Sequence, residues 1–74
     1  MIDLYDIAAR LEADEKLKLT YRFPVSTGKG SVMYETRTAN LLDVAEESNL
    51  LYVRHEGEVI WIKVDEAIEV LSDR

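Results

Sequence analysis

Residues 49–64 constrain the fold of this chain more than any other segment. They contain two short runs typical of β-strands on either side of a tight turn at Glu56-Gly57, and this pattern predicts a β-hairpin. Because strand side chains alternate between two faces, one face of the hairpin is fully apolar and carries Leu51, Val53, Ile60 and Ile62. That face is expected to cover a hydrophobic core.

The second face of the same hairpin is more apolar than a solvent-exposed sheet face usually is. It mixes aromatic, aliphatic and cationic side chains, namely Leu50, Tyr52, Arg54, Val59, Trp61 and Lys63. An antiparallel pair that covers only one side of a core is normally polar on its other face. We therefore expect a helix of the chain, a second copy or a partner to cover these six residues, which are the candidate interface. Aromatic residues beside cations also occur on platforms for single-stranded nucleic acid.

The length of 74 residues and the absence of cysteine limit how the chain is stabilised. A chain of this size forms a single domain, residues 1–74, and buries only about 60% of its unfolded surface. Disulfides and cysteine zinc sites are excluded, and a single histidine cannot form a histidine-rich metal site. Stability must then come from a well-packed core or from oligomerisation.

The charge of the chain points away from binding dominated by phosphates. Fifteen Asp and Glu residues stand against nine Lys and Arg, for a net charge of −6, and this field repels polyanions. No apolar run is long enough to cross a bilayer, and the first residues lack the basic and apolar segments of a signal peptide. We expect a soluble, cytoplasmic protein with no membrane partner.

The first half of the chain predicts a helix followed by a hairpin. Residues 3–14 have helical spacing, with Asp3 as cap and an apolar face made of Leu4, Ile7, Ala8 and Leu11. Residues 17–25 alternate between apolar and polar side chains, which predicts a strand. Residues 31–38 resume a strand pattern after the glycine-rich loop at 26–30.

Residues 38–48 are compatible with two structures. In one, Thr38 caps a helix, and the helix presents an acidic surface that suits a basic partner, made of Asp43, Glu46 and Glu47. In the other, residues 41–44 extend the preceding strand and residues 45–49 form a turn. We favour the helix because Ala-Glu-Glu is a poor strand sequence.

The C-terminal residues 65–72 predict a short helix capped by Asp65, with Ile68 and Leu71 facing inward. The expected fold is therefore a small α+β domain. Two hairpins form a four-stranded, mainly antiparallel sheet, and three helices pack against it.

No segment has the pattern of a catalytic or cofactor site. Residues 26–31 share Gly28-Lys29 with phosphate-binding loops but lack the rest of that motif, so a hairpin turn is the better interpretation. His55 lies beside a turn, without a neighbour to orient it as a general base. We expect no enzyme activity, no catalytic residue, no cofactor and no metal.

Three segments resemble Sm-type (Sm/Lsm-like) small β-barrels: residues 30–32, residues 39–47 with their Asn-Leu pair, and residues 57–68 with Ile-Lys-Val-Asp. The resemblance implies an N-terminal helix, a five-stranded bent sheet, assembly into a ring and RNA binding. The implied RNA-binding residues are Asn40 and Lys63. Residues 37–39 are Arg-Thr-Ala, where that family has an aspartate. Residues 63–64 are Lys-Val, where it has Arg-Gly.

The sequence thus predicts a small acidic, non-enzymatic protein. We expect a regulator or inhibitor that works by protein–protein contact and forms a homo-oligomer. The alternative is an Sm-like ring that binds RNA or a nucleotide.

Overall fold

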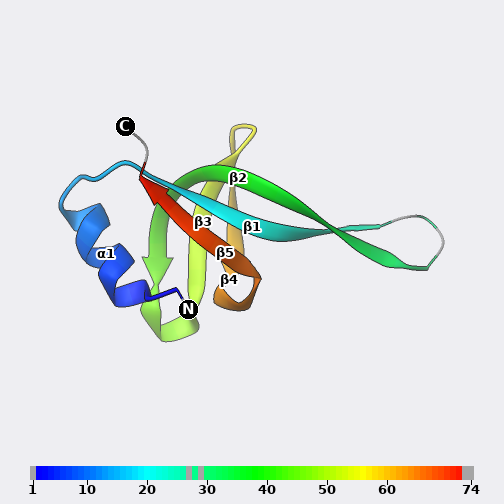
Figure 1. Cartoon of the computed structure of the whole chain (residues 1–74), viewed down its shortest axis with the longest axis horizontal. Helices are drawn as coiled ribbons and strands as arrows, with labels where there is room; N and C mark the ends of the chain where they lie inside the picture. The colour runs from blue at the N-terminus through cyan, green and yellow to red at the C-terminus, as the bar shows by residue number, and fades with distance from the viewer. Residues whose placement is uncertain (1, 27, 29, 73–74) are drawn as a thin grey trace.

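The computed structural model describes residues 2–26, 28 and 30–72, without the side chain of Ser26. One α-helix precedes a five-stranded sheet (Figure 1). The elements in chain order are α1 (Leu4–Glu12), β1 (Leu17–Ser26), β2 (Val32–Ala45), the 3₁₀ turn η1 (Glu46–Ser48), β3 (Leu50–His55), β4 (Glu58–Lys63), the 3₁₀ turn η2 (Val64–Glu66) and β5 (Ala67–Ser72). Neighbouring strands are antiparallel in the order β4-β3-β2-β1-β5.

The predicted N-terminal helix is confirmed as α1. The carboxylate of Asp3 accepts hydrogen bonds from the backbone N–H groups of Tyr5 at 3.0 Å and Asp6 at 3.3 Å, which satisfies donors that the first turn leaves unpaired. Leu4 and Ile7 are buried. The helix lies at one end of the molecule, opposite the long β1–β2 hairpin (Figure 1).

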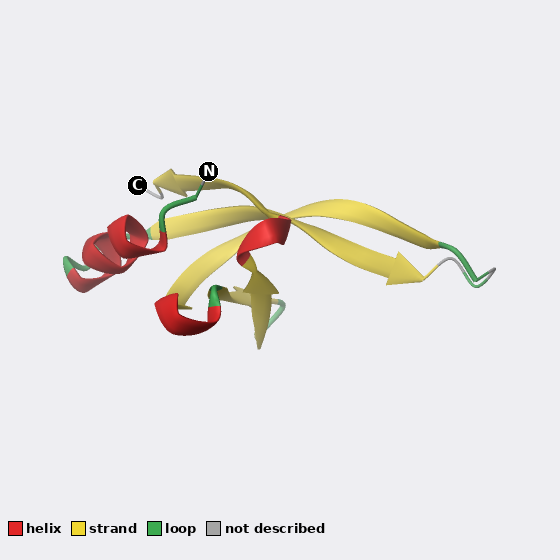
Figure 2. Cartoon of the chain, turned by 90° about the horizontal axis from the view of Figure 1, so that it is seen from below, coloured by secondary structure: helices red, strands yellow, loops and turns green. Residues whose placement is uncertain are grey.

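β1 is the strand predicted for residues 17–25, and it pairs with β2 over ten positions, from Leu17 opposite Leu41 to Ser26 opposite Val32. Only the first part of this hairpin belongs to the wider sheet. β5 pairs with β1 no further than Tyr21, and β3 pairs with β2 no further than Asn40. Residues 22–26 and 32–36 therefore form a two-stranded projection, the hairpin arm (Figures 1 and 2).

The loop that joins the two arm strands contains the Gly28-Lys29 pair shared with phosphate-binding loops. Thr27 and Lys29 lie outside the described residues. The chain continues from this loop into strand β2, whereas a phosphate-binding loop leads into a helix.

The helix predicted for residues 38–48 is wrong: the segment continues β2 to Ala45 and then forms η1. A β-bulge explains the error. Leu41 pairs with Val53 and Asp43 with Tyr52, which leaves Leu42 as an extra residue. The residues that the bulge turns inward are three positions apart, Leu41 and Val44, and this spacing imitates one face of a helix.

The predicted C-terminal helix is also wrong, because the segment forms η2 and then β5. Thr20 pairs with Glu69 and Tyr21 with Ala67, so Ile68 is the extra residue of a second bulge. Ala67 and Val70 are therefore the partly buried positions of β5, whereas Ile68 and Leu71 were expected inward and are 50% and 37% exposed. The four-stranded sheet with three helices is thus corrected to five strands and one α-helix, within the expected α+β class.

The second hairpin has the predicted register. Val53 lies opposite Ile60, Leu51 opposite Ile62, and Tyr52 opposite Trp61. The turn residues Glu56 and Gly57 have φ values of 51° and 82°, which match the left-handed turn that suits the twist of a two-residue hairpin.

The core lies on one face of the bent sheet. Its largest fully buried side chains are Leu19, Tyr21, Leu51 and Val53. α1 contributes Leu4 and Ile7 to the same cluster. No buried polar or charged residue occurs within the described part of the chain, so the core consists of aliphatic side chains and one tyrosine ring.

The Tyr21 hydroxyl is buried and has no hydrogen-bond partner among the described residues. An unpaired buried hydroxyl costs about 1–3 kcal/mol. We expect Tyr21→Phe to raise the free energy of unfolding by about 1 kcal/mol in urea denaturation. Tyr5→Phe is the matched control, because Tyr5 is 75% exposed and its hydroxyl is solvated. Destabilisation by Tyr21→Phe would contradict the unpaired hydroxyl.

Candidate interface groove at the free edge of β4

The six residues predicted as an interface share the outer face of the β3–β4 hairpin, which we call the outer hairpin face. Cross-strand pairing places Leu50 beside Lys63, Tyr52 beside Trp61, and Arg54 beside Val59. Val59 is 60% and Trp61 58% exposed. Large apolar side chains with this exposure are not covered by α1 or by any other described element.

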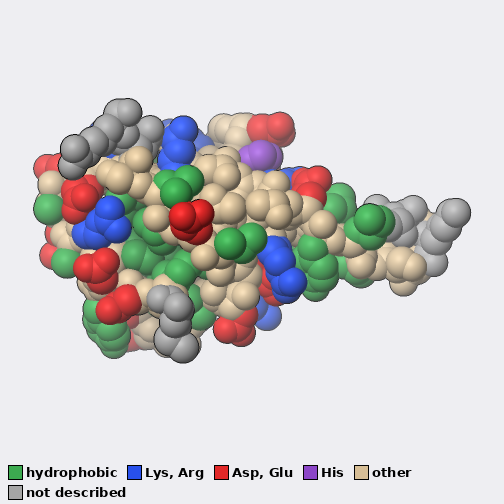
Figure 3. Space-filling view, viewed as in Figure 1, with side chains coloured by type: hydrophobic (Ala, Val, Ile, Leu, Met, Phe, Trp, Pro, Cys, Tyr) green, Lys and Arg blue, Asp and Glu red, His purple; other side chains and the backbone are tan. Residues whose placement is uncertain are grey.

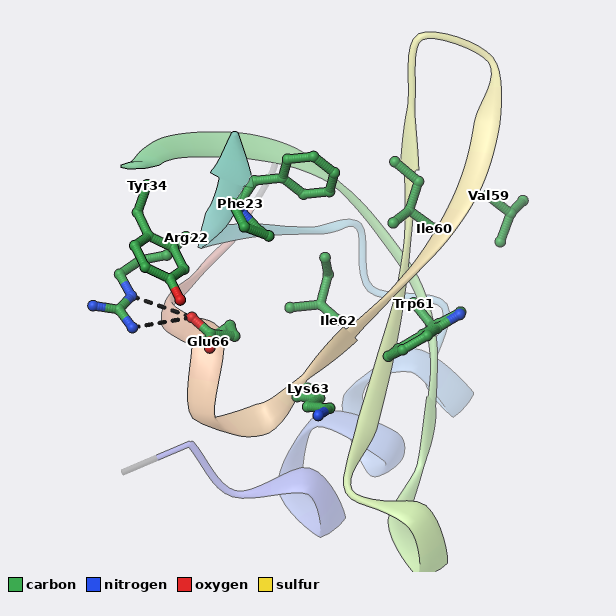
Figure 4. A pocket seen from close by; sticks show the side chains of 10 residues that line it. Arg22, Phe23, Tyr34, Val59, Ile60, Trp61, Ile62, Lys63 and Glu66 are labelled. Atoms are coloured by element: carbon green, nitrogen blue, oxygen red, sulfur yellow. Dashed lines mark hydrogen bonds and ion pairs between the residues drawn. The ribbon is translucent and has the colours of Figure 1, made fainter. Parts of the chain in front are cut away.

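A groove runs along the free edge of β4, next to this face (Figure 4). Its volume is about 510 Å³, within the range of about 300–1,000 Å³ typical of binding sites. One wall is residues 59–63 of β4 and the other is the base of the hairpin arm, with Glu66 of η2 between them. We call this feature the β4 groove.

The arm wall of the groove contains one cation, Arg22, which lies against an aromatic ring. The Arg22 guanidinium carbon lies 4.6 Å from the centre of the Tyr34 ring, a cation–π distance. The same guanidinium donates through Nε and Nη2 to Glu66 Oε2 at 3.2 and 3.1 Å (Figure 4). Arg22 therefore joins the base of the arm to η2.

A second arginine stacks on the opposite face of the arm. The Arg37 guanidinium carbon lies 3.9 Å from the centre of the Phe23 ring, and the same side chain pairs with Glu35. Cation–π contacts contribute about 0.5–1 kcal/mol each at exposed sites. The arm base is thus held on both faces, and its two guanidinium charges are already matched by carboxylates.

The charges of the groove differ from those of the whole chain. Arg22 and Glu66 neutralise one another, and Lys63 adds one positive charge in a protein of net charge −6. The remaining lining is mainly aliphatic and aromatic. This chemistry suits an apolar occupant better than a polyanion.

The predicted acidic surface is not a helix face. Asp43 lies at the β2 bulge, where its Oδ1 accepts a hydrogen bond from the Val44 N–H at 2.8 Å. Glu46 and Glu47 lie in η1. Asp43 and Glu47 are exposed and Glu46 is half-buried, so a partner can still reach carboxylates here.

The two residues implied for RNA binding are not brought together. Asn40 lies opposite Arg54, which lies opposite Val59, whereas Lys63 lies opposite Leu50. These rows are four positions apart along β3, about 13 Å at the rise of a strand. The structure therefore places Asn40 and Lys63 at opposite ends of the β3–β4 hairpin.

His55 is half-buried, and its Nε2 lies 3.9 Å from Glu56 Oε1 at the turn. Among the described residues, no three His, Asp or Glu side chains are grouped so that they could hold a metal ion. Neither feature adds to the groove.

Three of the groove residues, Val59, Trp61 and Lys63, are among the predicted interface residues, and Ile60 and Ile62 were expected on the core face. Sequence reasoning missed the residues of the arm and η2, namely Arg22, Phe23, Pro24, Tyr34 and Glu66. These residues come from segments that meet only because η2 and β4 lie beside the arm base (Figure 4). The spacing of residues along the chain does not predict contacts between such distant segments. The one available signal was the apolar alternation of β1 continuing past Pro24.

Comparison of the chain with protein-family models, with curated proteins and with solved structures finds no match in any of the three. Within the described residues, no helix has the length and apolar character needed to cross a membrane.

The Arg22–Glu66 contact predicts a local effect. Arg22→Gln should increase amide hydrogen exchange in the hairpin arm, because it removes the link to η2. Global stability should fall by less than about 1 kcal/mol, since exposed ion pairs contribute little. Arg10→Gln is the control: it breaks the Arg10–Glu15 pair and should leave exchange in the arm unchanged. Equal protection of the arm in both variants would contradict the link.

Proposed function

We propose that this chain is a small acidic, non-enzymatic regulatory or inhibitory protein of the cytoplasm that acts by protein–protein contact and assembles with copies of itself. The observation that carries the proposal is the exposure of Val59 and Trp61 on an edge strand. Tryptophan is enriched among residues that dominate binding energy at interfaces.

The edge position of β4 adds to the argument. An edge strand presents unpaired backbone N–H and C=O groups, and natural proteins usually protect it with charges, proline or a covering element. β4 carries Lys63 near its end, but its centre is Val-Ile-Trp-Ile. Such an edge is suited to receiving another polypeptide.

Self-association also supplies stability that a chain of 74 residues lacks. The acidic side chains would then serve the regulatory target. Asp43, Glu46 and Glu47 lie away from the groove lining, so a basic partner can be selected by charge while the copies remain together.

Mutation of the single tryptophan tests the self-association. Wild-type protein should form a dimer or larger assembly at about 100 μM in sedimentation velocity. Trp61→Ala should weaken the assembly by about 2 kcal/mol or more, as expected for a central anchor, with the circular dichroism spectrum unchanged. Tyr5→Ala is the control on an exposed residue of α1. A wild-type monomer at this concentration would exclude the proposed assembly.

A second candidate function is an Sm-like ring that binds RNA. It is favoured by the order of elements, an N-terminal helix and then a bent five-stranded antiparallel sheet (Figure 2), which is what that resemblance implies. β4 and β5 are both free edges. Edge-to-edge pairing of these different strands would repeat head to tail, which gives a ring when the rotation between copies closes.

Assembly size and RNA binding separate the two candidates. A ring predicts more than two copies by native mass spectrometry and salt-dependent binding of a single-stranded RNA oligonucleotide. Lys63→Gln and Asn40→Ala should each reduce that binding, whereas Arg10→Gln on α1 should not. A dimer that leaves RNA unbound at low salt would eliminate the ring.

A further inference from the structure

We propose that the hairpin arm of one copy occupies the β4 groove of a second copy, and that the exchange is reciprocal, giving a two-fold dimer. The inference rests on the proposed function, because it takes the β4 edge as a contact between copies. It goes beyond the proposed function because it names the segment of the second copy that fills the groove.

The arm is apolar on both of its faces. Residues directly opposite each other share a face, so Pro24 and Tyr34 lie on one face, while Val25 and Met33 lie on the other. Val32 is 60%, Met33 63% and Tyr34 52% exposed. Hydrophobic side chains are visible along the arm in Figure 3.

A two-stranded ribbon without a covering layer is marginally stable in water. No strand besides β1 and β2 pairs with the arm within the described residues. The arm also projects away from the remainder of its own sheet (Figures 1 and 2). Val32 and Met33 do not line the groove of their own chain. The end of the arm therefore does not cover that groove.

The exposed area favours a second copy as that occupant. Five large apolar side chains are available, Val32, Met33, Tyr34, Val59 and Trp61, each 52% to 63% exposed. Aromatic side chains present roughly 150–250 Å² each, so the exposed parts of Tyr34 and Trp61 alone supply about 200 Å², and Val32, Met33 and Val59 add to this area. A stable interface buries about 800 Å² per partner. The arm or the groove alone supplies only part of this area, and reciprocal exchange adds the two on each copy.

The charges agree with this occupant. Between Arg22 and Glu35, the sequence has a single charged residue, Lys29 in the loop. The arm strands therefore bring no unpaired charge into the apolar groove, where such a charge would be costly. Nucleic acid would instead need free cations along the arm, and Arg22 and Arg37 are paired with Glu66 and Glu35.

Cysteine cross-linking tests the exchange directly, because the native chain has no cysteine. Val32→Cys protein and isotope-labelled Val59→Cys protein are mixed and treated with a short bis-maleimide reagent. Mass spectrometry should show the mixed pair as the main cross-linked species. Val32→Cys mixed with Tyr5→Cys is the control, since Tyr5 is 75% exposed but lies on α1, and it should give at least fivefold less product.

A second pair tests the competing contact. Val59→Cys mixed with Ile68→Cys should give little product if the arm fills the groove. A high yield from this pair, with none from Val32→Cys and Val59→Cys, would show edge-to-edge pairing of β4 with β5 and would overturn the exchange.

A shortened arm provides an independent measurement. Replacement of residues 25–33 by Asn-Gly keeps the groove residues Pro24, Tyr34 and Trp61 and should weaken dimerisation at least tenfold in sedimentation velocity. If this variant is folded and dimerises like wild type while Trp61→Ala does not, the arm exchange fails and the proposed function stands. If wild-type protein is monomeric at about 100 μM, the proposed function fails with it.

Discussion

The bulge at Leu42 is the constraint on which the rest of this structure depends. β2 pairs with β1 over ten positions and then passes to β3. Without the extra residue, strict alternation would turn Val44 outward. With it, Leu41 and Val44 both reach the core, the strand bends, and the β3–β4 hairpin turns out of the plane of the long hairpin (Figure 2).

The bend also creates the β4 groove. Because the β3–β4 hairpin turns back, the edge of β4 lies across from the base of the arm, and η2 brings Glu66 to Arg22. Residues that are 44 positions apart in the chain then line the same groove. The arm and the groove are both mainly apolar, and both depend on the long strand β2. This strand supplies half of the arm, and its bend places β4 across from the arm base.

The accuracy of the sequence predictions depends on whether strand pairing is regular. Residues 17–26 and 50–63 pair with their hairpin partners without a shift in register, and their alternation predicted both the strands and the faces. β2 and β5 each contain a bulge, and there the inward residues are three apart, as in Leu41 and Val44. A three-residue spacing favours a helix in any analysis of periodicity. The helix expected for residues 65–72 rests on such a spacing at Ile68 and Leu71, whereas the helix expected for residues 38–48 rests on Ala-Glu-Glu as a poor strand sequence.

The sequence by itself determined the N-terminal helix, the two hairpins and the six residues of the outer hairpin face, because each depends on contacts within about 20 residues of chain. Only the tertiary structure decided that residues 67–72 add a fifth strand to β1, since pairing with a distant edge overrides a weak local preference. The same holds for the β4 groove. Its walls come from β4, the arm and η2, and the bulge that brings them together is a shift in pairing between strands, which no single strand specifies.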